Sequence, residues 1–352
     1  MKLLIINFEM DDHSGVLAWQ ASLARALAAR CESVWVLTER IGSFAPASNL
    51  SVDRLDYRPF GIPYRAGGWL LAQWRIAREC KRRGIDRCFI HMNHPWGYRL
   101  QPVFRLTGIP CVMWYAHGNV SPSLRWALRG VTRVITSTPE GFRIKSPKIR
   151  IVGQGIDSRL FRVPAFAAER NDILYVGRVS PRKRIDLLLA VMAEVAKIDP
   201  ANPMRLRIVG PTLTPEDQRY DMEMRSRMWS MGLQDRVEFT GFVPQEHHPG
   251  LYASAFLHLN VSKTGSMDKT VLEALACGCP VLTSNEAFRE MLSPRPEFRL
   301  DSDDPGVIAR RMLAIHSGMA AYPPEPLRAM VAGIHDQDNL VNKVMAQLGE
   351  VK

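Results

Sequence analysis

Residues 262–284 read SKTGSMDKTVLEALACGCPVLTS, and this stretch decides the fold. It combines a small polar loop containing Gly265, a helical run from about Thr270 to Cys277, and a short apolar strand after Pro280. A loop that opens directly into a helix aims several unpaired backbone N–H groups, and the positive end of the helix, at one point. We therefore expect the start of this helix to hold a phosphate group.

Glu273 lies in the first turn of the predicted helix, where a carboxylate can accept two hydrogen bonds from a sugar diol. Phosphate and sugar together indicate a nucleotide. The same residues also fit a capping box, in which Thr270 starts the helix, Glu273 closes that start and Gly278 ends it. The local pattern leaves both interpretations open.

The ending LEALACGCPVLTS, with the segments upstream of it, resembles the retaining glycosyltransferases of family 4 (glycosyltransferase group 1). These are two-domain GT-B enzymes that use sugar nucleotides. In that family two Glu residues, separated by seven other residues, flank this loop, and the second holds the ribose of the donor. Glu273 matches the second, whereas Gly265 stands in place of the first, which normally contacts hydroxyls of the donor sugar. Asp268, in the same loop, is a candidate to replace it.

The composition is that of a globular protein with two domains. The chain has 352 residues, of which 46% are hydrophobic and 23% charged, and domains usually contain one to two hundred residues. The opening MKLLIINFEMDD predicts a buried strand rather than a signal peptide, and no apolar run reaches the length of a membrane span. The six cysteines show neither disulfide nor zinc spacing, so we expect a reduced, cytoplasmic protein.

The first 150 residues alternate between strand and helix patterns. Apolar runs at residues 2–8, 33–37, 87–92, 110–115, 132–137 and 149–152 read as buried strands, and helices are expected around 16–29, 97–107, 122–129 and 139–145. This alternation predicts a doubly wound parallel sheet. The full glycine fingerprint of dinucleotide-binding proteins is missing after the first strand, which disfavours a dehydrogenase.

Four residues at the ends of these strands are candidates for the site. The resemblance implies that Gly15 approaches both donor and acceptor and that His117, in Ala116-His117-Gly118, is the catalytic histidine that contacts the donor sugar near the reacting carbon. A turn glycine and a packed histidine are the alternatives. His91 and His94, after the neighbouring strand, are weaker candidates for acceptor contacts.

The second half repeats the alternation from residue 171 onward. Arg178 follows a strand, and Lys183 lies near the next helix start, so the two cations can converge on a pyrophosphate through charge-assisted hydrogen bonds. The resemblance implies that this pair grips the donor phosphates, although Arg184 replaces the glycine that usually follows the lysine. It also implies that Val243 marks a backbone segment beside the base. The donor-binding loop and helix start then comprise Gly265, Ser266, Met267, Asp268, Lys269 and Glu273.

Basic residues are concentrated in the first half of the chain. Residues 1–165 hold 24 Lys and Arg against 11 Asp and Glu, a net charge of +13, and the remainder has a net charge of −2. A helix around 69–83 interleaves tryptophan with cations and could lie on an anionic membrane surface; the alternative is an ordinary amphipathic helix with a solvated charged side. The residues in question are Trp69, Trp74, Arg75, Arg78, Lys81, Arg82 and Arg83. No nucleic-acid-binding motif accompanies this charge.

We therefore expect an α/β protein of GT-B fold, with two Rossmann-like doubly wound parallel-sheet domains facing across a cleft. The predicted boundaries are 1–160 for an acceptor domain, 161–335 for a nucleotide-sugar domain and 336–352 for a C-terminal helix that crosses back to the first domain. The resemblance implies transfer of a sugar with retention from a UDP- or GDP-sugar to a glycan or lipid-linked glycan, without metal or other cofactor. The alternatives are a non-catalytic nucleotide or glycan binder and a GT-B epimerase or phosphorylase.

Overall fold

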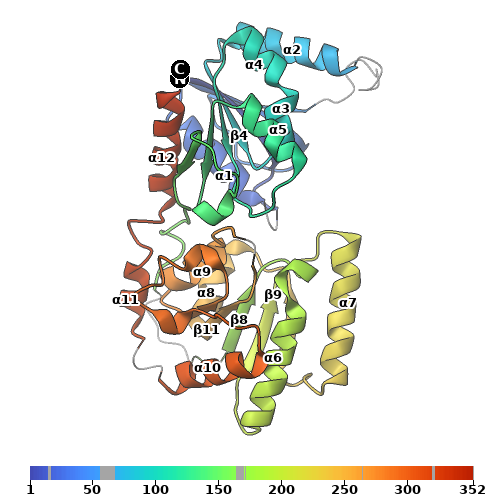
Figure 1. Cartoon of the computed structure of the whole chain (residues 1–352), viewed down its shortest axis with the longest axis vertical. Coiled ribbons are helices and arrows are strands. Elements are labelled where there is room, and N and C mark those ends of the chain that lie inside the picture. Colours follow the sequence, from blue (N-terminus) through green and yellow to red (C-terminus); the bar gives the residue numbers. More distant parts are fainter. Residues whose placement is uncertain are drawn as a thin grey trace. The chain divides into compact units, whose positions relative to one another are not determined.

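The protein is described here by a computed structural model that covers residues 1–14, 17–55, 68–163, 170, 172–263, 265–318 and 322–351. The chain forms two compact units (Figure 1). Unit 1 comprises Met1–Gly153 together with Leu340–Lys352, and unit 2 comprises Gln154–Asn339. The sequence-based boundaries, after residues 160 and 335, differ from this division by a few residues.

Unit 1 contains a parallel sheet of seven strands in the order β3-β2-β1-β4-β5-β6-β7. The strands are β1 (Lys2–Met10), β2 (Ser33–Ile41), β3 (Leu50–Arg54), β4 (Arg87–His91), β5 (Cys111–Trp114), β6 (Arg133–Thr136) and β7 (Ile149–Ile151). In the centre of the sheet, Ile5 of β1 is in register with Val36 of β2 on one side and with Phe89 of β4 on the other. The strand order reverses between β1 and β4, and ligands bind at the carboxyl ends of strands at such a switch point.

Helices cover both faces of this sheet because its strands are apolar on both sides. Successive side chains of a strand point to opposite faces. Leu3 and Ile5 of β1 therefore pack in one hydrophobic cluster, with α1 (Ala18–Ala28) and α12 (Gln337–Glu350). Leu4 and Ile6 pack in the other cluster, with α2 (Gly68–Arg83), α3 (Pro95–Arg99), α4 (Gln101–Thr107) and α5 (Pro122–Gly130).

Helix α12 belongs to unit 1 although it follows unit 2 in the sequence. Figure 1 shows it, in red, along α1. Its apolar side, which includes Leu340, Val344 and Leu348, is buried in the unit 1 core. Arg133 of β6 anchors the helix end by donating to Glu350 Oε2 at 2.7 Å. The last helix thus completes the core of the first unit.

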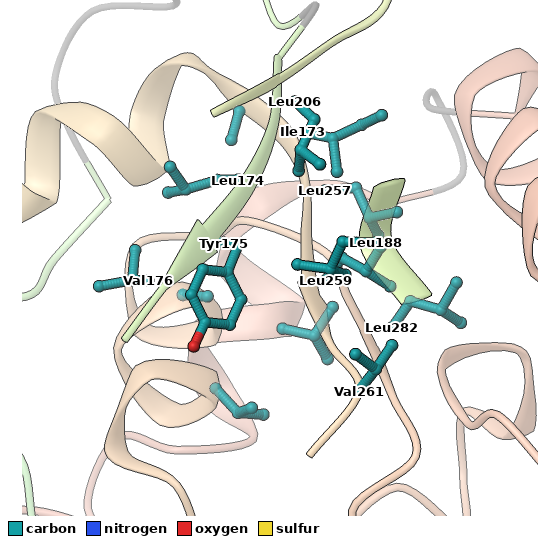
Figure 2. Close-up of a cluster of buried hydrophobic side chains, with 14 of the residues drawn as sticks. Ile173, Leu174, Tyr175, Val176, Leu188, Leu206, Leu257, Leu259, Val261 and Leu282 are labelled. Carbon is teal, nitrogen blue, oxygen red and sulfur yellow. The ribbon is translucent and has the colours of Figure 1, made fainter. Parts of the chain in front are cut away.

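Unit 2 contains a parallel sheet of five strands in the order β10-β9-β8-β11-β12. The strands are β8 (Asp172–Val176), β9 (Arg205–Val209), β10 (Val237–Gly241), β11 (Ala255–Asn260) and β12 (Val281–Thr283). Figure 2 shows its core, in which Leu188 of α6 (Ile185–Ile198) lies among Leu257, Leu259 and Leu282 of the strands. The strand order reverses between β8 and β11, so the carboxyl ends of these two strands flank the second switch point.

The remaining helices of unit 2 are α7 (Pro215–Ser230), α8 (His248–Ser254), α9 (Lys269–Ala276), α10 (Pro305–Ser317) and α11 (Pro324–Ala329). Within the described ranges, none of the helices combines the length and the apolar character that crossing a bilayer requires. The predicted α/β class with two doubly wound parallel sheets is confirmed.

Two expectations differ from the structure. Residues 139–145 do not form an α-helix: a single 3-10 turn, Pro139–Gly141, is followed by Phe142 in extended conformation with its ring buried in the core. Strand β3 was missed, because its sequence LSVDR lies at the sheet edge with polar, partly exposed side chains and carries little apolar pattern.

Candidate functional site

The loop before α9 has the backbone shape that the sequence suggested. Gly265 has a φ of 68°, a left-handed conformation that costs a residue with a Cβ about 1 kcal/mol or more. Helix α9 begins at Lys269 after Asp268, which occupies the N-cap position without a side-chain capping bond. The capping-box interpretation is therefore wrong, because Thr270 lies inside the helix and Glu273 does not reach back to its start.

Asp268 is instead the centre of a hydrogen-bond network. Its Oδ1 accepts from Lys183 Nζ at 3.1 Å. Its Oδ2 accepts from three side chains at or just after the ends of β11 and β12: Asn260 Nδ2 at 3.0 Å, Ser262 Oγ at 2.5 Å and Asn285 Nδ2 at 3.3 Å. Burial alone would raise the pKa of Asp268, but the Lys183 ammonium and the bonds from Ser262 and Asn260 outweigh it and hold the pKa below its usual value.

This network determines what Asp268 can contribute. Oδ2 already accepts from three donors of the protein itself, and Oδ1 is held by the Lys183 ammonium, which leaves at most one acceptor position for a sugar hydroxyl in place of the carboxylate that Gly265 lacks. Its main effect on a ligand is indirect. It fixes the Lys183 ammonium beside the loop, and it joins the loop to the ends of β11 and β12.

Ser266 and Met267 complete the loop. The backbone carbonyl of Ser266 accepts from Asn285 Nδ2 at 2.7 Å. The Met267 side chain is buried in the unit 2 core, so only its backbone can contact a ligand. The loop is therefore anchored on both sides, by the amide of Asn285 and by the apolar core.

Glu273 lies on α9 one turn after Lys269, and its side chain is buried. Its Oε2 accepts from the Tyr252 hydroxyl of α8 at 3.2 Å, and its Oε1 accepts from Gln245 Nε2 at 3.3 Å. Burial raises the pKa of Glu273 to about 7, against the opposing effects of the Lys269 charge and of the bonds from Tyr252 and Gln245. Burial also lowers the pKa of Lys269 well below its usual value, with Glu273 acting against it.

Arg178 and Lys183 both follow β8. Arg178 Nε lies 3.8 Å from Asp217 Oδ2, a carboxylate that also closes the capping box at the start of α7. The Tyr175 hydroxyl donates to the backbone carbonyl of Arg178 at 2.9 Å and fixes the chain where it leaves the strand. Each of the two cations is thus held by one carboxylate, Asp217 or Asp268.

Arg184 occupies the N-cap position of α6 with a φ of 57°. Glycine adopts this left-handed conformation without steric cost, whereas the Cβ of arginine makes it unfavourable. This accounts for the glycine that the family resemblance implies at this position. The side chain compensates in part, because its Nη1 pairs with Asp303 Oδ1 at 2.9 Å. Asp303 also pairs with Lys263, next to the loop.

Val243 follows β10 and packs against the unit 2 core. Its backbone carbonyl lies 3.0 Å from His248 Nε2. A carbonyl can only accept, so His248 donates from Nε2. Burial lowers the pKa of His248, against the opposing effect of the bond to the Val243 carbonyl.

In unit 1, His117 lies just beyond β5. Its backbone N–H donates to the Gly141 carbonyl at 2.8 Å, and its Nδ1 accepts from the Asn119 backbone N–H at 3.0 Å. This second bond fixes the orientation of the ring and places the proton of the neutral form on Nε2. His117 is partly exposed, so Nε2 is the ring atom with which it can act on a ligand.

The two other histidines of unit 1 differ in their surroundings. His91, at the end of β4, is buried and packs against the rings of Trp19 and Trp114, which is the environment of a core side chain. His94 Nε2 lies 2.9 Å from Ser123 Oγ, and burial lowers the pKa of the ring. Gly15 lies outside the described residues.

The structure therefore brings predicted residues of unit 2 together in two groups. Lys183, Ser266 and Asp268 are linked in unit 2 through the loop network, and Lys269 and Glu273 form a coupled pair on α9. Sequence reasoning missed the residues that hold these groups. They are Asp217, Gln245, Tyr252, Asn260, Ser262 and Asn285.

No cluster of three or more His, Cys, Asp or Glu side chains with the geometry of a metal site is found among the described residues. Asp301-Ser302-Asp303 superficially resembles a metal-binding DxD motif, but its carboxylates pair with cations of the protein. Asp301 pairs with Arg299, and Asp303 pairs with Arg184 and Lys263.

Residues 170–317, which include most of unit 2, match the family described as Glycosyl transferases group 1. Mannosylfructose-phosphate synthase of Agrobacterium fabrum is 27% identical over 173 residues, which cover 44% of this chain and 38% of that protein. D-inositol 3-phosphate glycosyltransferase of Frankia alni is 26% identical over 336 residues, which cover 78% of each chain. The chain thus spans well under half of the first relative and over three quarters of the second.

The fold is similar to that of solved GT-B proteins. Anabaena Alr3699/HepE, whose crystal structure contains UDP and glucose, aligns over 100% of both chains with a TM-score of 0.79 and 17% sequence identity. The predicted GT-B class and the resemblance to group 1 glycosyltransferases are confirmed. Membership of family 4 is compatible with these matches and stays a prediction.

Proposed function

We propose that this protein is a retaining glycosyltransferase that moves a sugar from a UDP- or GDP-sugar to the hydroxyl of a glycan or lipid-linked glycan in cell-envelope polysaccharide or lipopolysaccharide synthesis. The observation that carries the proposal is in unit 2, where Lys183 is fixed by Asp268 beside the loop that opens α9 and Glu273 lies one turn into that helix. The family match over residues 170–317 supports the same assignment.

The leaving group of such a reaction is a nucleoside diphosphate, whose developing charge must be stabilised. Arg178, Lys183 and the backbone N–H groups at the start of α9 would supply that stabilisation. In this proposal no metal is required, because fixed cations of the protein take its place. The structure of Alr3699/HepE with UDP and glucose is a precedent for a UDP ligand in this fold.

Glu273 would bind the ribose hydroxyls of the donor. Its carboxylate accepts from Tyr252 and Gln245, and each oxygen retains acceptor capacity for a sugar hydroxyl. Val243 would lie beside the base. In unit 1, His117 would contact the donor sugar through Nε2, with the ring held by the Asn119 N–H. Retention follows from the family resemblance, through attack on the same face from which the diphosphate leaves.

The experiment is a thermal melt with UDP, GDP, ADP and their common sugar conjugates. A ligand at about a hundred times its Kd adds ~2.7 kcal/mol, which moves the midpoint of a domain of this size by several degrees. We expect a shift with one base only, lost in Lys183→Ala and Glu273→Ala and kept in the matched surface control Lys197→Ala. Well-folded protein that shifts with none of these ligands would contradict the proposal.

One observation favours a second candidate, a non-catalytic nucleotide or glycan binder. Gly265 removes the carboxylate that contacts the donor sugar in the family, and Asp268 is engaged elsewhere. Such a binder would show the same thermal shift but no turnover of the sugar nucleotide. A GT-B epimerase or phosphorylase would release the nucleotide without any acceptor hydroxyl, so the dependence of release on an acceptor separates it from a transferase.

A further inference from the structure

One face of unit 1 combines exposed apolar side chains with positive charge. The helices of this face are α2, α3, α4 and α5, which share one hydrophobic cluster on the same side of the sheet. Helix α2 contacts α4, α4 contacts α3, and α3 contacts α5, so the four form one continuous layer (Figure 1). We refer to the solvent side of this layer as the docking face.

Large apolar side chains of the docking face point into solvent. Leu106 of α4 is 76% exposed, and Trp74 of α2 and Trp126 of α5 are both 59% exposed. Trp69 and Leu70, at the start of α2, are also exposed. Single exposed apolar residues are ordinary, but a group of them on adjacent helices marks an interaction site.

The charge of the docking face has one sign. Helices α2 to α5 carry nine Arg and Lys and one acidic residue, Glu79. That carboxylate is engaged within the helix by Arg82 at 2.7 Å and Arg83 at 3.3 Å. An acidic partner surface would therefore experience almost no electrostatic repulsion from these helices.

The aromatic and cationic side chains are in direct contact. The Arg78 guanidinium lies 5.4 Å from the centre of the Trp74 ring, and the Arg129 guanidinium lies 4.8 Å from that of Trp126. Each of these pairs places an apolar ring next to a cation. Proteins that bind at the boundary between the lipid head groups and the acyl chains use this combination.

We infer that the docking face binds an anionic lipid bilayer, with Trp74, Leu106 and Trp126 in the interfacial region and the arginines at the lipid phosphates. The sequence indicated helix α2 alone, and the structure adds α4 and α5. Three exposed apolar side chains on separate helices would fix the orientation of the docking face on the bilayer. A single amphipathic helix would not fix it. Nucleic acid would use the charge, but it would gain little from an exposed Leu106 and two tryptophans outside any base-binding groove.

The test is sedimentation with vesicles of phosphatidylcholine alone and of phosphatidylcholine with phosphatidylglycerol. We expect binding to the anionic vesicles only, weakened by salt. Arg78→Gln and Arg129→Gln should each weaken binding about fivefold, which corresponds to ~1 kcal/mol per basic residue near the membrane. The double variant Trp74→Ser, Trp126→Ser should also weaken it and should reduce the blue shift of tryptophan fluorescence on binding.

The matched control is α7 of unit 2, where Trp229 and Met222 are 65% and 62% exposed. Trp229→Ser and Met222→Gln should leave vesicle binding unchanged. Unaltered thermal midpoints verify that the docking-face variants are folded. Equal binding to neutral vesicles, equal losses in the α7 variants, or duplex DNA that displaces anionic vesicles at equal charge concentration would each overturn the inference.

Discussion

The network around Asp268 gives the sharpest prediction. Asp268→Asn keeps the shape of the side chain but places an amide N–H₂ against Lys183 Nζ if the amide oxygen continues to accept from Asn260, Ser262 and Asn285. The variant therefore loses one charge-assisted hydrogen bond, worth ~1.5–3 kcal/mol, and leaves the Lys183 ammonium, whose side chain is 21% exposed, without its counter-ion. We expect unit 2 to lose ~2–3 kcal/mol, or about 4–12 °C in Tm.

The pH dependence checks the cause. The folded-state pKa of Asp268 is lowered, so its stabilising contribution is full above the unfolded pKa of ~3.9 and is lost as pH falls through the folded value. The difference between wild type and variant in urea unfolding should be constant near neutral pH and shrink below about pH 4. The control is Asp301→Asn, whose carboxylate pairs with Arg299 but is 79% exposed; it should cost under ~1 kcal/mol.

Ligand binding then distinguishes whether Asp268 positions Lys183 or contacts the donor sugar directly. If Asp268 acts through Lys183 on the phosphates, the variant should lose affinity equally for the nucleoside diphosphate and for its sugar conjugate. A loss confined to the sugar conjugate, in a variant as stable as Asp301→Asn, would refute the reasoning and show that the carboxylate contacts the donor sugar.

Three further predictions concern single residues of the site. Because the pKa of Glu273 is raised to about 7 from 4.5, its stabilising effect is full below pH 4.5 and is lost as pH rises through 7. In urea unfolding, the wild type should therefore lose up to ~3 kcal/mol of stability relative to Glu273→Gln between pH 4.5 and 8. A difference that stays constant over this pH range would contradict the prediction. Gly265→Ala should lower stability by ~1–2 kcal/mol in thermal melts, as should Gly333→Ala, which has a φ of 76° and open space around it; a gain would show that the loop is not left-handed. His117→Ala should reduce sugar transfer by roughly a hundredfold or more while the nucleotide-induced thermal shift remains, and loss of that shift would assign His117 a structural role.

The sequence predicted most elements of the fold because the spacing of apolar residues and the positions of turn-forming residues indicate the same helix or strand in each segment. The start of α9 was placed within one residue, and the strand expected after Pro280 is β12, Val281–Thr283. The exceptions lacked such agreement: the edge strand β3 has no buried residue, and within residues 139–145 only Pro139–Gly141 form a 3-10 turn, after which Phe142 enters the core.

The site was less predictable, because its partners are distant in sequence. The loop pattern and the family resemblance pointed to Lys183, Asp268 and Glu273, but no local pattern shows that Asn285 would donate to Asp268, or Tyr252 to Glu273. These contacts arise where β11, β12 and α8 meet in the folded unit. A sequence does not distinguish a carboxylate that four donors of the protein engage, as in Asp268, from one whose pKa is raised by burial, as in Glu273.

The place of α12 has a consequence for synthesis on the ribosome. Domains generally fold in the order in which they are made, and unit 2 is one continuous segment, Gln154–Asn339. Unit 1 lacks Leu340, Val344 and Leu348 of its core until α12 emerges. The apolar surface beside α1 therefore stays uncovered while unit 2 is translated. The unit that is synthesised first is completed last.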